Sequence, residues 1–259
     1  MSAPAPAISV QRVTRHFGRV TAVDDVSLDI GEAEFLAVVG ASGSGKTTLL
    51  RLINRLIAPE AGHIVIHGED IAHGDAVALR RRIGMVFQSG ALFPHMSVAD
   101  NIGITPRLIG RPRREIAARI DEMMALVQLA PELRARLPHE LSGGQRQRVG
   151  VARALAASPR IMLMDEPFGA LDPLTRDALG QDYRGLHARL GLVTVMVTHD
   201  IAEALLLADR IAVMRKGRLI AVADPKRISQ SGDAYVRDLL RAPRRQAERL
   251  AALLTQDAR

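Results

Sequence analysis

The stretch that decides the fold reads Phe35-Leu36-Ala37-Val38-Val39-Gly40-Ala41-Ser42-Gly43-Ser44-Gly45-Lys46-Thr47. Its five leading apolar residues are typical of a buried strand, and they run directly into a glycine-rich turn. Over residues 47–56, leucine and isoleucine then recur at helical spacing. A strand, a glycine-rich loop and a helix in this order predict an α/β domain with a ligand site where the strand ends.

The glycine-rich turn fits the pattern G-x-x-x-x-G-K-[ST], which between a strand and a helix indicates a phosphate-binding loop. Glycines let backbone N–H groups converge on phosphate oxygens, and the helix adds the positive end of its dipole. We expect Lys46 to neutralise the β- and γ-phosphates of a nucleotide and Thr47 to offer its hydroxyl to Mg²⁺. The expected phosphate-binding residues are Gly40, Ala41, Ser42, Gly43, Ser44, Gly45, Lys46 and Thr47.

Two adjacent carboxylates, Asp165 and Glu166, follow a second apolar stretch over residues 161–164. Open α/β sheets bind ligands at the carboxyl ends of their strands, so both acids are expected near the phosphate loop. Asp165 can hold the Mg²⁺ shell, while Glu166 can act as the general base for the attacking water. Without a phosphate loop, a solvated strand end would be an equally good interpretation.

The sequence Leu141-Ser142-Gly143-Gly144-Gln145 precedes a predicted helix, with Ser142 at the position of an N-cap. Two glycines ahead of a helix expose backbone N–H groups, which makes a second anion site. One nucleotide rarely needs two such sites in one subunit. The second site is therefore expected to serve a nucleotide bound to a partner molecule, and a capped helix with a glycine-rich entry is the alternative.

These three motifs, with the glycine-rich loop first and the Asp-Glu strand end last, resemble the ATP-binding-cassette family over about residues 8–230. The resemblance implies that Phe17 stacks on adenine, that Gln88 links Mg²⁺ to a helical insertion, and that His199 senses the γ-phosphate. It also implies that the loop Ala170-Leu171-Asp172 crosses a dimer interface. The implied nucleotide contacts further include Thr48, Gln145 and Asp172, and the implied cofactors are ATP and Mg²⁺.

Hydrophobic patterning divides the chain into parts that agree with this resemblance. Apolar residues alternate over residues 8–30, as in half-buried antiparallel strands, and helical patterns replace strands over residues 107–157. We expect a P-loop NTPase core with a mixed or parallel sheet, an N-terminal antiparallel β subdomain and an inserted α-helical subdomain. The expected boundaries are an ATPase domain over 1–240, with its core at 8–88 and 158–230 and the insertion at 89–157, and a C-terminal helical tail over 241–259.

The composition excludes several functional classes. The 259 residues include no Cys, which excludes disulfides and thiolate catalysis, and only 3% aromatic residues, which leaves little for stacking on bases. The net charge of +7 comes mainly from arginines spread along the chain, so nucleic acid is not an expected partner. No apolar run is long enough to cross a bilayer. We therefore expect a cytoplasmic protein. The resemblance to the ATP-binding-cassette family further implies a peripheral position on the inner face of the bacterial cell membrane.

Four stretches resemble one subgroup, the importers of glycine betaine, choline, carnitine and similar quaternary-amine osmoprotectants. These stretches lie at 53–57, 79–84, 91–96 and 165–172. The resemblance implies a head-to-tail homodimer whose ATP-driven closure powers transmembrane permease subunits, with a substrate-binding protein as an indirect partner. Residues 89–101 are expected to receive a short helix of the permease, or else to pack as ordinary core.

Other functions remain open alternatives. The same ATPase could drive another cargo, such as an amino acid or lipid. A DNA-associated ATPase of the same family would need a long coiled coil between Lys46 and Ser142, and the sequence between them has no sustained heptads. A translation-associated protein would need two copies of each motif, and the chain has one.

Overall fold

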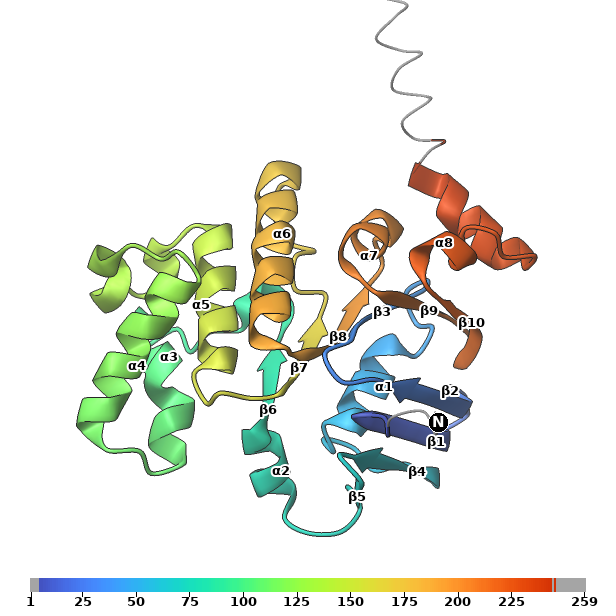
Figure 1. Cartoon of the computed structure of the whole chain (residues 1–259), viewed down its shortest axis with the longest axis horizontal. Coiled ribbons are helices and arrows are strands. Elements are labelled where there is room, and N and C mark those ends of the chain that lie inside the picture. Colours follow the sequence, from blue (N-terminus) through green and yellow to red (C-terminus); the bar gives the residue numbers. More distant parts are fainter. Residues whose placement is uncertain (1–4, 244, 246–259) are drawn as a thin grey trace, which may run out of the picture.

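A computed structural model, which describes residues 5–243 and 245, contains two sheets separated by a helix (Figure 1). The larger sheet has the strand order β10-β9-β3-β8-β7-β6 and is parallel except for the pair β9 and β10. Its strands are β3 (Phe35–Val39), β6 (Ile83–Val86), β7 (Ile161–Asp165), β8 (Val193–Thr198), β9 (Arg210–Arg215) and β10 (Arg218–Ala223).

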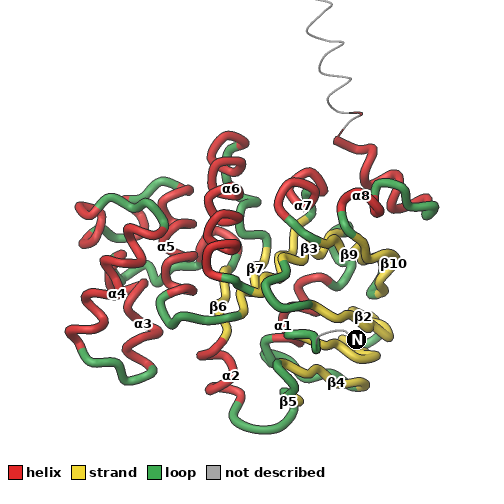
Figure 2. Tube along the Cα trace, viewed as in Figure 1, coloured by secondary structure: helices red, strands yellow, loops and turns green. Residues whose placement is uncertain are grey.

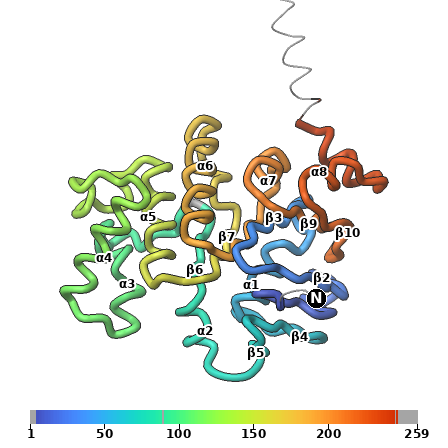
Figure 3. The backbone as a smooth tube through the Cα atoms, viewed as in Figure 1, coloured from blue at the N-terminus to red at the C-terminus, as the bar shows by residue number. Residues whose placement is uncertain are grey.

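The smaller sheet is antiparallel, with the strand order β2-β1-β4-β5. Its strands are β1 (Ile8–Phe17), β2 (Val20–Ile30), β4 (Ala61–Ile66) and β5 (Glu69–Asp70). Apolar side chains alternate along β2, where Val26, Leu28 and Ile30 are buried, so only one face of this sheet packs on the core. Figure 3 shows the N-terminal strand β2 close to β10, a strand from the last part of the described chain.

Helices cover both faces of the larger sheet (Figure 2). The helices are α1 (Lys46–Ile53), α2 (Ala76–Arg82), α3 (Val98–Leu108), α4 (Arg113–Leu126), α5 (Gly143–Leu155), α6 (Pro173–Leu190), α7 (Ile201–Leu207) and α8 (Pro225–Ile228). Of these, α3 and α4 lie beside the sheet and pack mainly against each other and α5. Three short 3₁₀ turns are η1 (Gln88–Gly90), η2 (Pro131–Ala135) and η3 (Pro138–Glu140). No helix in the described part of the chain combines the length and the apolar character that crossing a bilayer requires.

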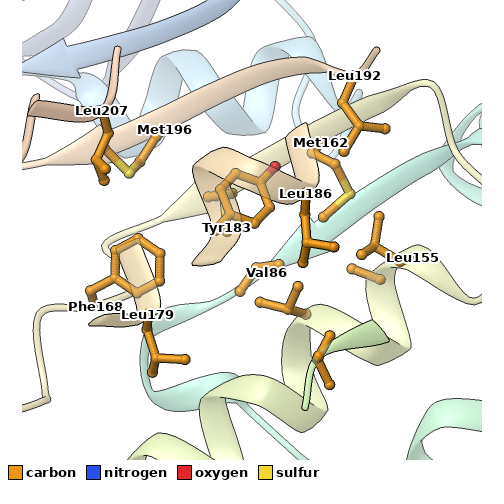
Figure 4. Close-up of a cluster of buried hydrophobic side chains, with 14 of the residues drawn as sticks. Val86, Leu155, Met162, Phe168, Leu179, Tyr183, Leu186, Leu192, Met196 and Leu207 are labelled. Carbon is orange, nitrogen blue, oxygen red and sulfur yellow. The ribbon is translucent and has the colours of Figure 1, made fainter. Parts of the chain in front are cut away.

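The central strand β3 divides the core in two because successive side chains of a strand point to opposite faces. Phe35, Ala37 and Val39 join the core beneath α3 to α7. Leu36 and Val38 join the core between the larger sheet, α1 and the smaller sheet. Figure 4 shows part of the first core, where Phe168, Leu179, Tyr183 and Leu186 from the β7–α6 region pack with Val86, Leu155, Met162 and Met196.

The predicted fold class is confirmed, with small shifts at helix ends. Helix α1 ends at Ile53 instead of residue 56, since Arg55 takes a left-handed φ of 48° that breaks the helix. Helix α5 begins at Gly143, directly after Ser142, which is its N-cap as predicted. The tail predicted over 241–259 lies outside the described residues apart from 241–243 and 245, which are helical.

Candidate active site

The phosphate loop is shaped by close contacts with both sheets. Gly45 is the N-cap of α1 with a φ of 104°, and a Cβ there would lie 2.1 Å from the carbonyl oxygen of Ala22 in β2. A Cβ on Gly40 would lie 2.2 Å from the carbonyl oxygen of Met214 in β9. Glycine is therefore required at both positions, since no side chain fits between the loop and its neighbours.

Lys46 is buried in this loop at 6% exposure, without a carboxylate close enough to form an ion pair among the described residues. Its Nζ donates to the carbonyl oxygens of Gly40 at 2.8 Å and Ala41 at 3.0 Å. Burial lowers the pKa of Lys46, although the nearby carboxylates of Glu166 and Asp165 oppose this shift. A buried cation held only by carbonyl dipoles fits a site that binds anions.

The rest of the loop offers further donors to the same space. The Ser44 hydroxyl is buried and has no hydrogen-bond partner in the described structure. Ser42 and Gly43 lie exposed at the tip of the loop, with Gly43 at a φ of 75°, and Thr48 is half-buried in the first turn of α1. An unpartnered buried hydroxyl beside a buried ammonium group is what a phosphate-binding cradle requires.

Thr47 and Asp165 meet at the carboxyl ends of β3 and β7, where the Thr47 hydroxyl donates to Asp165 Oδ1 at 2.9 Å. Burial raises the pKa of Asp165, while the hydrogen bond from Thr47 lowers it. Mg²⁺ prefers hard oxygen ligands, and a hydroxyl and a carboxylate at one point supply two of them. These residues therefore fit the Mg²⁺ role predicted for them.

Glu166 lies one residue beyond β7, in the left-handed region at a φ of 46°. Its backbone N–H donates to the Val197 carbonyl oxygen at 2.9 Å, which ties it to the end of β8. This places Glu166 Oε2 at 3.3 Å from Nδ1 of His199, which follows β8 directly. The structure thus brings together two residues that are 33 positions apart in the sequence (199 − 166).

Gln88 and Phe17 lie farther out. Gln88 begins η1 at the exposed end of β6, which pairs with β7, so it lies at the same edge of the larger sheet as Asp165. Phe17 ends β1 and is 47% exposed, with the guanidinium carbon of Arg15 5.1 Å from its ring centroid. An exposed aromatic ring beside a cation is suited to stacking on a planar ligand.

The sequence Ser142 to Gln145 forms a capping box at the start of α5. The Ser142 N–H donates to Gln145 Oε1 at 2.8 Å, and the Gln145 N–H donates to Ser142 Oγ at 3.2 Å. Figure 1 shows α6 and β7 between α5 and the phosphate-loop helix α1. The half-buried residues Gly143 and Gly144, in the first turn of α5, therefore lie away from the phosphate loop of their own chain.

Asp172 is the N-cap of α6, where its carboxylate accepts the backbone N–H of Thr175 at 3.0 Å. Hydrogen bonding from Thr175 lowers the pKa of the Asp172 carboxyl, which keeps it ionised. The family resemblance implied that a loop over residues 170–172 crosses a dimer interface, and the cap of α6 by Asp172 was not predicted. The signal was present, since Asp before Pro173 and an apolar helix is a typical helix start.

Two contacts of the site were not predicted from the sequence. The hydroxyl of Tyr235, in the helical segment over 234–243, accepts the N–H of Ala41 in the phosphate loop at 3.0 Å. Arg176 donates to Asp200 beside His199. No local pattern could reveal the first contact, because its two residues are 194 positions apart.

Comparison with known proteins identifies relatives of the whole arrangement. Residues 23–169 match the family described as ABC transporter. The chain is 47% identical over 222 residues to the glycine betaine/carnitine/choline transport ATP-binding protein of Bacillus subtilis, covering 85% of this chain and 58% of that protein. It is also 47% identical over 225 residues to the sulfate/thiosulfate import ATP-binding protein of Caulobacter vibrioides, covering 85% and 66%. The chain thus spans less than two thirds of the length of both curated relatives.

A solved structure extends the likeness to three dimensions. A dimeric ATP-binding cassette, in a post-hydrolysis state and bound to ADP and Pi, matches with a TM-score of 0.76 at 33% identity. The match covers 84% of this chain and 98% of that one.

Proposed function

This chain belongs to the ABC transporter family, and we propose that it is the ATP-hydrolysing subunit of an importer. The proposed reaction converts ATP and water into ADP and phosphate. One observation carries the proposal, namely the grouping of buried Lys46, the Thr47–Asp165 pair and the Glu166–His199 pair around the carboxyl ends of β3, β7 and β8.

Each residue has a chemical role in this reaction. The phosphate loop and Lys46 hold the phosphates and balance their charge, and Phe17 stacks on adenine. Glu166 accepts a proton from the attacking water. His199, whose Nδ1 is 3.3 Å from Glu166 Oε2, contacts the γ-phosphate in this proposal. Mg²⁺, held by Thr47, Asp165 and Gln88, would neutralise charge that develops on the phosphates.

A second copy of the chain completes the site in this proposal. The N–H groups of Gly143 and Gly144 belong to the first turn of α5, and α6 and β7 lie between α5 and the phosphate-loop helix α1 (Figure 1). In a head-to-tail dimer, Ser142, Gly143, Gly144 and Gln145 close over the nucleotide held by the partner subunit. ATP binding then closes the dimer and hydrolysis reopens it, with the Asp172 loop at the interface. The related ADP-bound cassette is dimeric.

The dimer is proposed to drive transmembrane permease subunits, with a substrate-binding protein as an indirect partner, from the cytoplasmic face of the bacterial membrane. Phe87 and Phe93, on either side of η1, are each 40% exposed, which suits a surface that receives an apolar permease helix. Nucleic acid has no place in this proposal.

The proposed cargo is a quaternary-amine osmoprotectant of the glycine betaine or choline type, as in the name of the Bacillus subtilis relative. The alternative is another cargo, since the relative named for sulfate and thiosulfate import is equally identical to this chain. An amino acid or lipid cargo was predicted as a further alternative, and none of the relatives compared above is named for one.

The hydrolysis proposal is tested with Glu166→Gln, which keeps the shape of the side chain but removes the base. We expect ATP turnover to fall at least a hundredfold and an ATP-dependent dimer to accumulate, measured by phosphate release and light scattering. Glu115→Gln, an exposed acid on α4, is the matched control and should behave as wild type. Retained turnover in Glu166→Gln would contradict the assignment of the base.

The cargo proposal is tested by uptake of labelled glycine betaine and of labelled sulfate in host cells that carry Glu166→Gln. Selective loss of glycine betaine uptake supports the proposed cargo. Selective loss of sulfate uptake supports the alternative, and loss of neither refutes both.

A further inference from the structure

Arg176 connects two loops of the candidate site that are far apart in the sequence, the loop before Asp172 and the turn after His199. It lies in the first turn of α6, and its Nη2 donates to the carbonyl oxygens of Leu171 at 3.2 Å and Gly169 at 3.5 Å. Its Nη1 donates to Asp200 Oδ2 at 3.2 Å. One planar guanidinium therefore spans from the loop before Asp172 to the residue after His199.

The Asp200 end of this connection is rigid. Asp200 caps α7, where its Oδ1 accepts the backbone N–H groups of Ala202 at 2.9 Å and Glu203 at 3.3 Å. Its own N–H donates to the Thr198 hydroxyl at 3.0 Å. Because Thr198 and Asp200 flank His199, any force on the Asp200 carboxylate acts directly on the backbone that carries His199.

The other end is the loop between Glu166 and Asp172. The Gly169 N–H donates to the Glu166 carbonyl oxygen at 3.3 Å, so this loop turns back on the proposed base. Together with the 3.3 Å contact between Glu166 and His199, Arg176 closes a ring of contacts around both residues. If this loop shifts while Arg176 keeps its contacts with Leu171 and Asp200, His199 must shift as well.

We propose that Arg176 is a positioning residue that couples the Asp172 loop to His199. Docking of a second copy on the Asp172 loop then sets the alignment of His199 with Glu166, so hydrolysis starts only when the dimer is closed. This inference rests on the proposed ATPase function, because it assigns a regulation to the same site.

The exposure of Arg176 argues against a purely structural role. Its side chain is 31% exposed and Asp200 is 32% exposed, and ion pairs at such half-exposed positions add little to fold stability. The cap of α7 uses Asp200 Oδ1, whereas Arg176 contacts Oδ2. Asp200→Asn therefore keeps the cap and removes only the charge that Arg176 contacts.

The test compares Arg176→Gln, Arg176→Lys, Asp200→Asn and the double variant of Arg176→Gln with Asp200→Asn. We expect about a tenfold lower kcat for Arg176→Gln with an unchanged KM for ATP, and a similar loss in Asp200→Asn. The double variant should lose no more than either single variant, because both break one connection. Arg176→Lys keeps the positive charge but loses the guanidinium geometry that reaches both loops at once. We therefore expect its kcat to lie between those of Arg176→Gln and wild type. Arg189→Gln, also exposed on α6, is the matched control.

A second measurement does not depend on hydrolysis. The side-chain NMR resonance of His199, assigned with His199→Gln, should shift in Arg176→Gln but not in Arg189→Gln. An unmoved His199 resonance, additive losses in the double variant, or a kcat loss that only follows lost stability would overturn the coupling. Wild-type protein that fails to hydrolyse ATP while the resonance still shifts would refute the proposed function and leave the positioning role of Arg176 supported.

Discussion

The phosphate loop and the turn from Ser142 to Gln145 are both glycine-rich helix starts, yet they are built in opposite ways. In the loop, Lys46 is 6% exposed and Thr47 reaches Asp165 at the end of β7. In the turn, the side chains of Ser142 and Gln145 each accept a hydrogen bond from the other residue's backbone N–H, and Ser142 is exposed. The loop depends on the whole fold, whereas the turn is satisfied within four residues.

This difference teaches how glycine serves each region. In the loop, glycine is required by the fold, because a Cβ on Gly40 or Gly45 would overlap a carbonyl oxygen. In the turn, a Cβ on Gly143 would lie 3.4 Å from Leu171 Cδ2, which is ordinary contact. The fold does not need glycine at position 143, which agrees with the proposed docking of a second copy on this turn, whereas a Cβ on Gly144 would lie 2.7 Å from Thr175 Cγ2.

The largest expected effect comes from removing the positive charge of the phosphate loop without changing its glycines. Lys46→Ala removes the buried ammonium group, and we expect hydrolysis to fall about 10²–10³-fold, as for other lost electrostatic contacts to a transition state. Lys226→Ala removes a lysine from α8 and serves as the control. Phosphate release measures both variants. Activity in Lys46→Ala within threefold of wild type would show that the loop does not act on phosphate.

The next effect tests whether the loop depends on both sheets. Gly45→Ala places a Cβ 2.1 Å from the Ala22 carbonyl oxygen at a φ of 104°, and we expect a loss of about 2–4 kcal/mol in the free energy of unfolding. Gly43→Ala has a φ of 75° but open space around its Cβ, so it should lose only about 1 kcal/mol. Urea denaturation compares the two variants, and equal losses would contradict the close contact with β2.

A third prediction applies the same substitution to the turn. Gly143→Ala lies in the first turn of α5, and we expect a gain of up to about 1 kcal/mol in stability, because alanine favours helix. Hydrolysis should nevertheless fall about tenfold, or ~1.4 kcal/mol in transition-state binding, because the partner's nucleotide needs this bare backbone. Gly185→Ala on α6 has open space around its Cβ and should gain stability without losing activity. Full activity in Gly143→Ala would remove the distinction between the two regions.

The smallest expected effect is a pH dependence of stability that arises from His187, away from both glycine-rich regions. His187 on α6 is 2% exposed, and burial and the charge of Arg184 lower its pKa below the ordinary 6.5, while Asp209 and a hydrogen bond with the Ala33 backbone oppose this. Below pH 6.5 the unfolded chain binds a proton that the folded chain resists. Stability should therefore fall as the pH drops from 6.5 toward the lowered pKa.

The comparison of wild type with His187→Gln isolates this contribution, since the other histidines affect both proteins. We expect the urea midpoint of wild type to fall more between pH 7.5 and pH 5.5 than that of the variant. A larger fall in the variant would contradict this prediction, because it would mean that protonation of His187 stabilises the folded chain.

Local sequence patterns predicted those parts of the fold that local chemistry decides. The strand Phe35–Val39 and the N-cap at Ser142 follow from patterns within a few residues. The phosphate loop was recognised from its motif, although contacts with both sheets shape it. The pairing of β3 between β8 and β9 does not, because those strands lie more than 150 residues later and compete with other apolar strands.

The same division holds for the candidate site. Thr47, Asp165 and Glu166 could be named from two motifs, and their roles remain predictions. The contacts of Tyr235 with Ala41 and of Arg176 with Asp200 could not be named, since a lone tyrosine or arginine carries no signal until the fold supplies its neighbour.

The contacts of the phosphate loop also determine when, during synthesis of the chain, this loop can fold. The Gly217 N–H donates to the Ser44 carbonyl oxygen at 3.0 Å, and both partners of β3 follow residue 192. While the ribosome is still synthesising the middle of the chain, Phe35–Val39 therefore has neither neighbouring strand. The nascent chain exposes a bare apolar strand for most of its synthesis, and it becomes able to hold a nucleotide only when β9 and the turn at Gly217 have emerged.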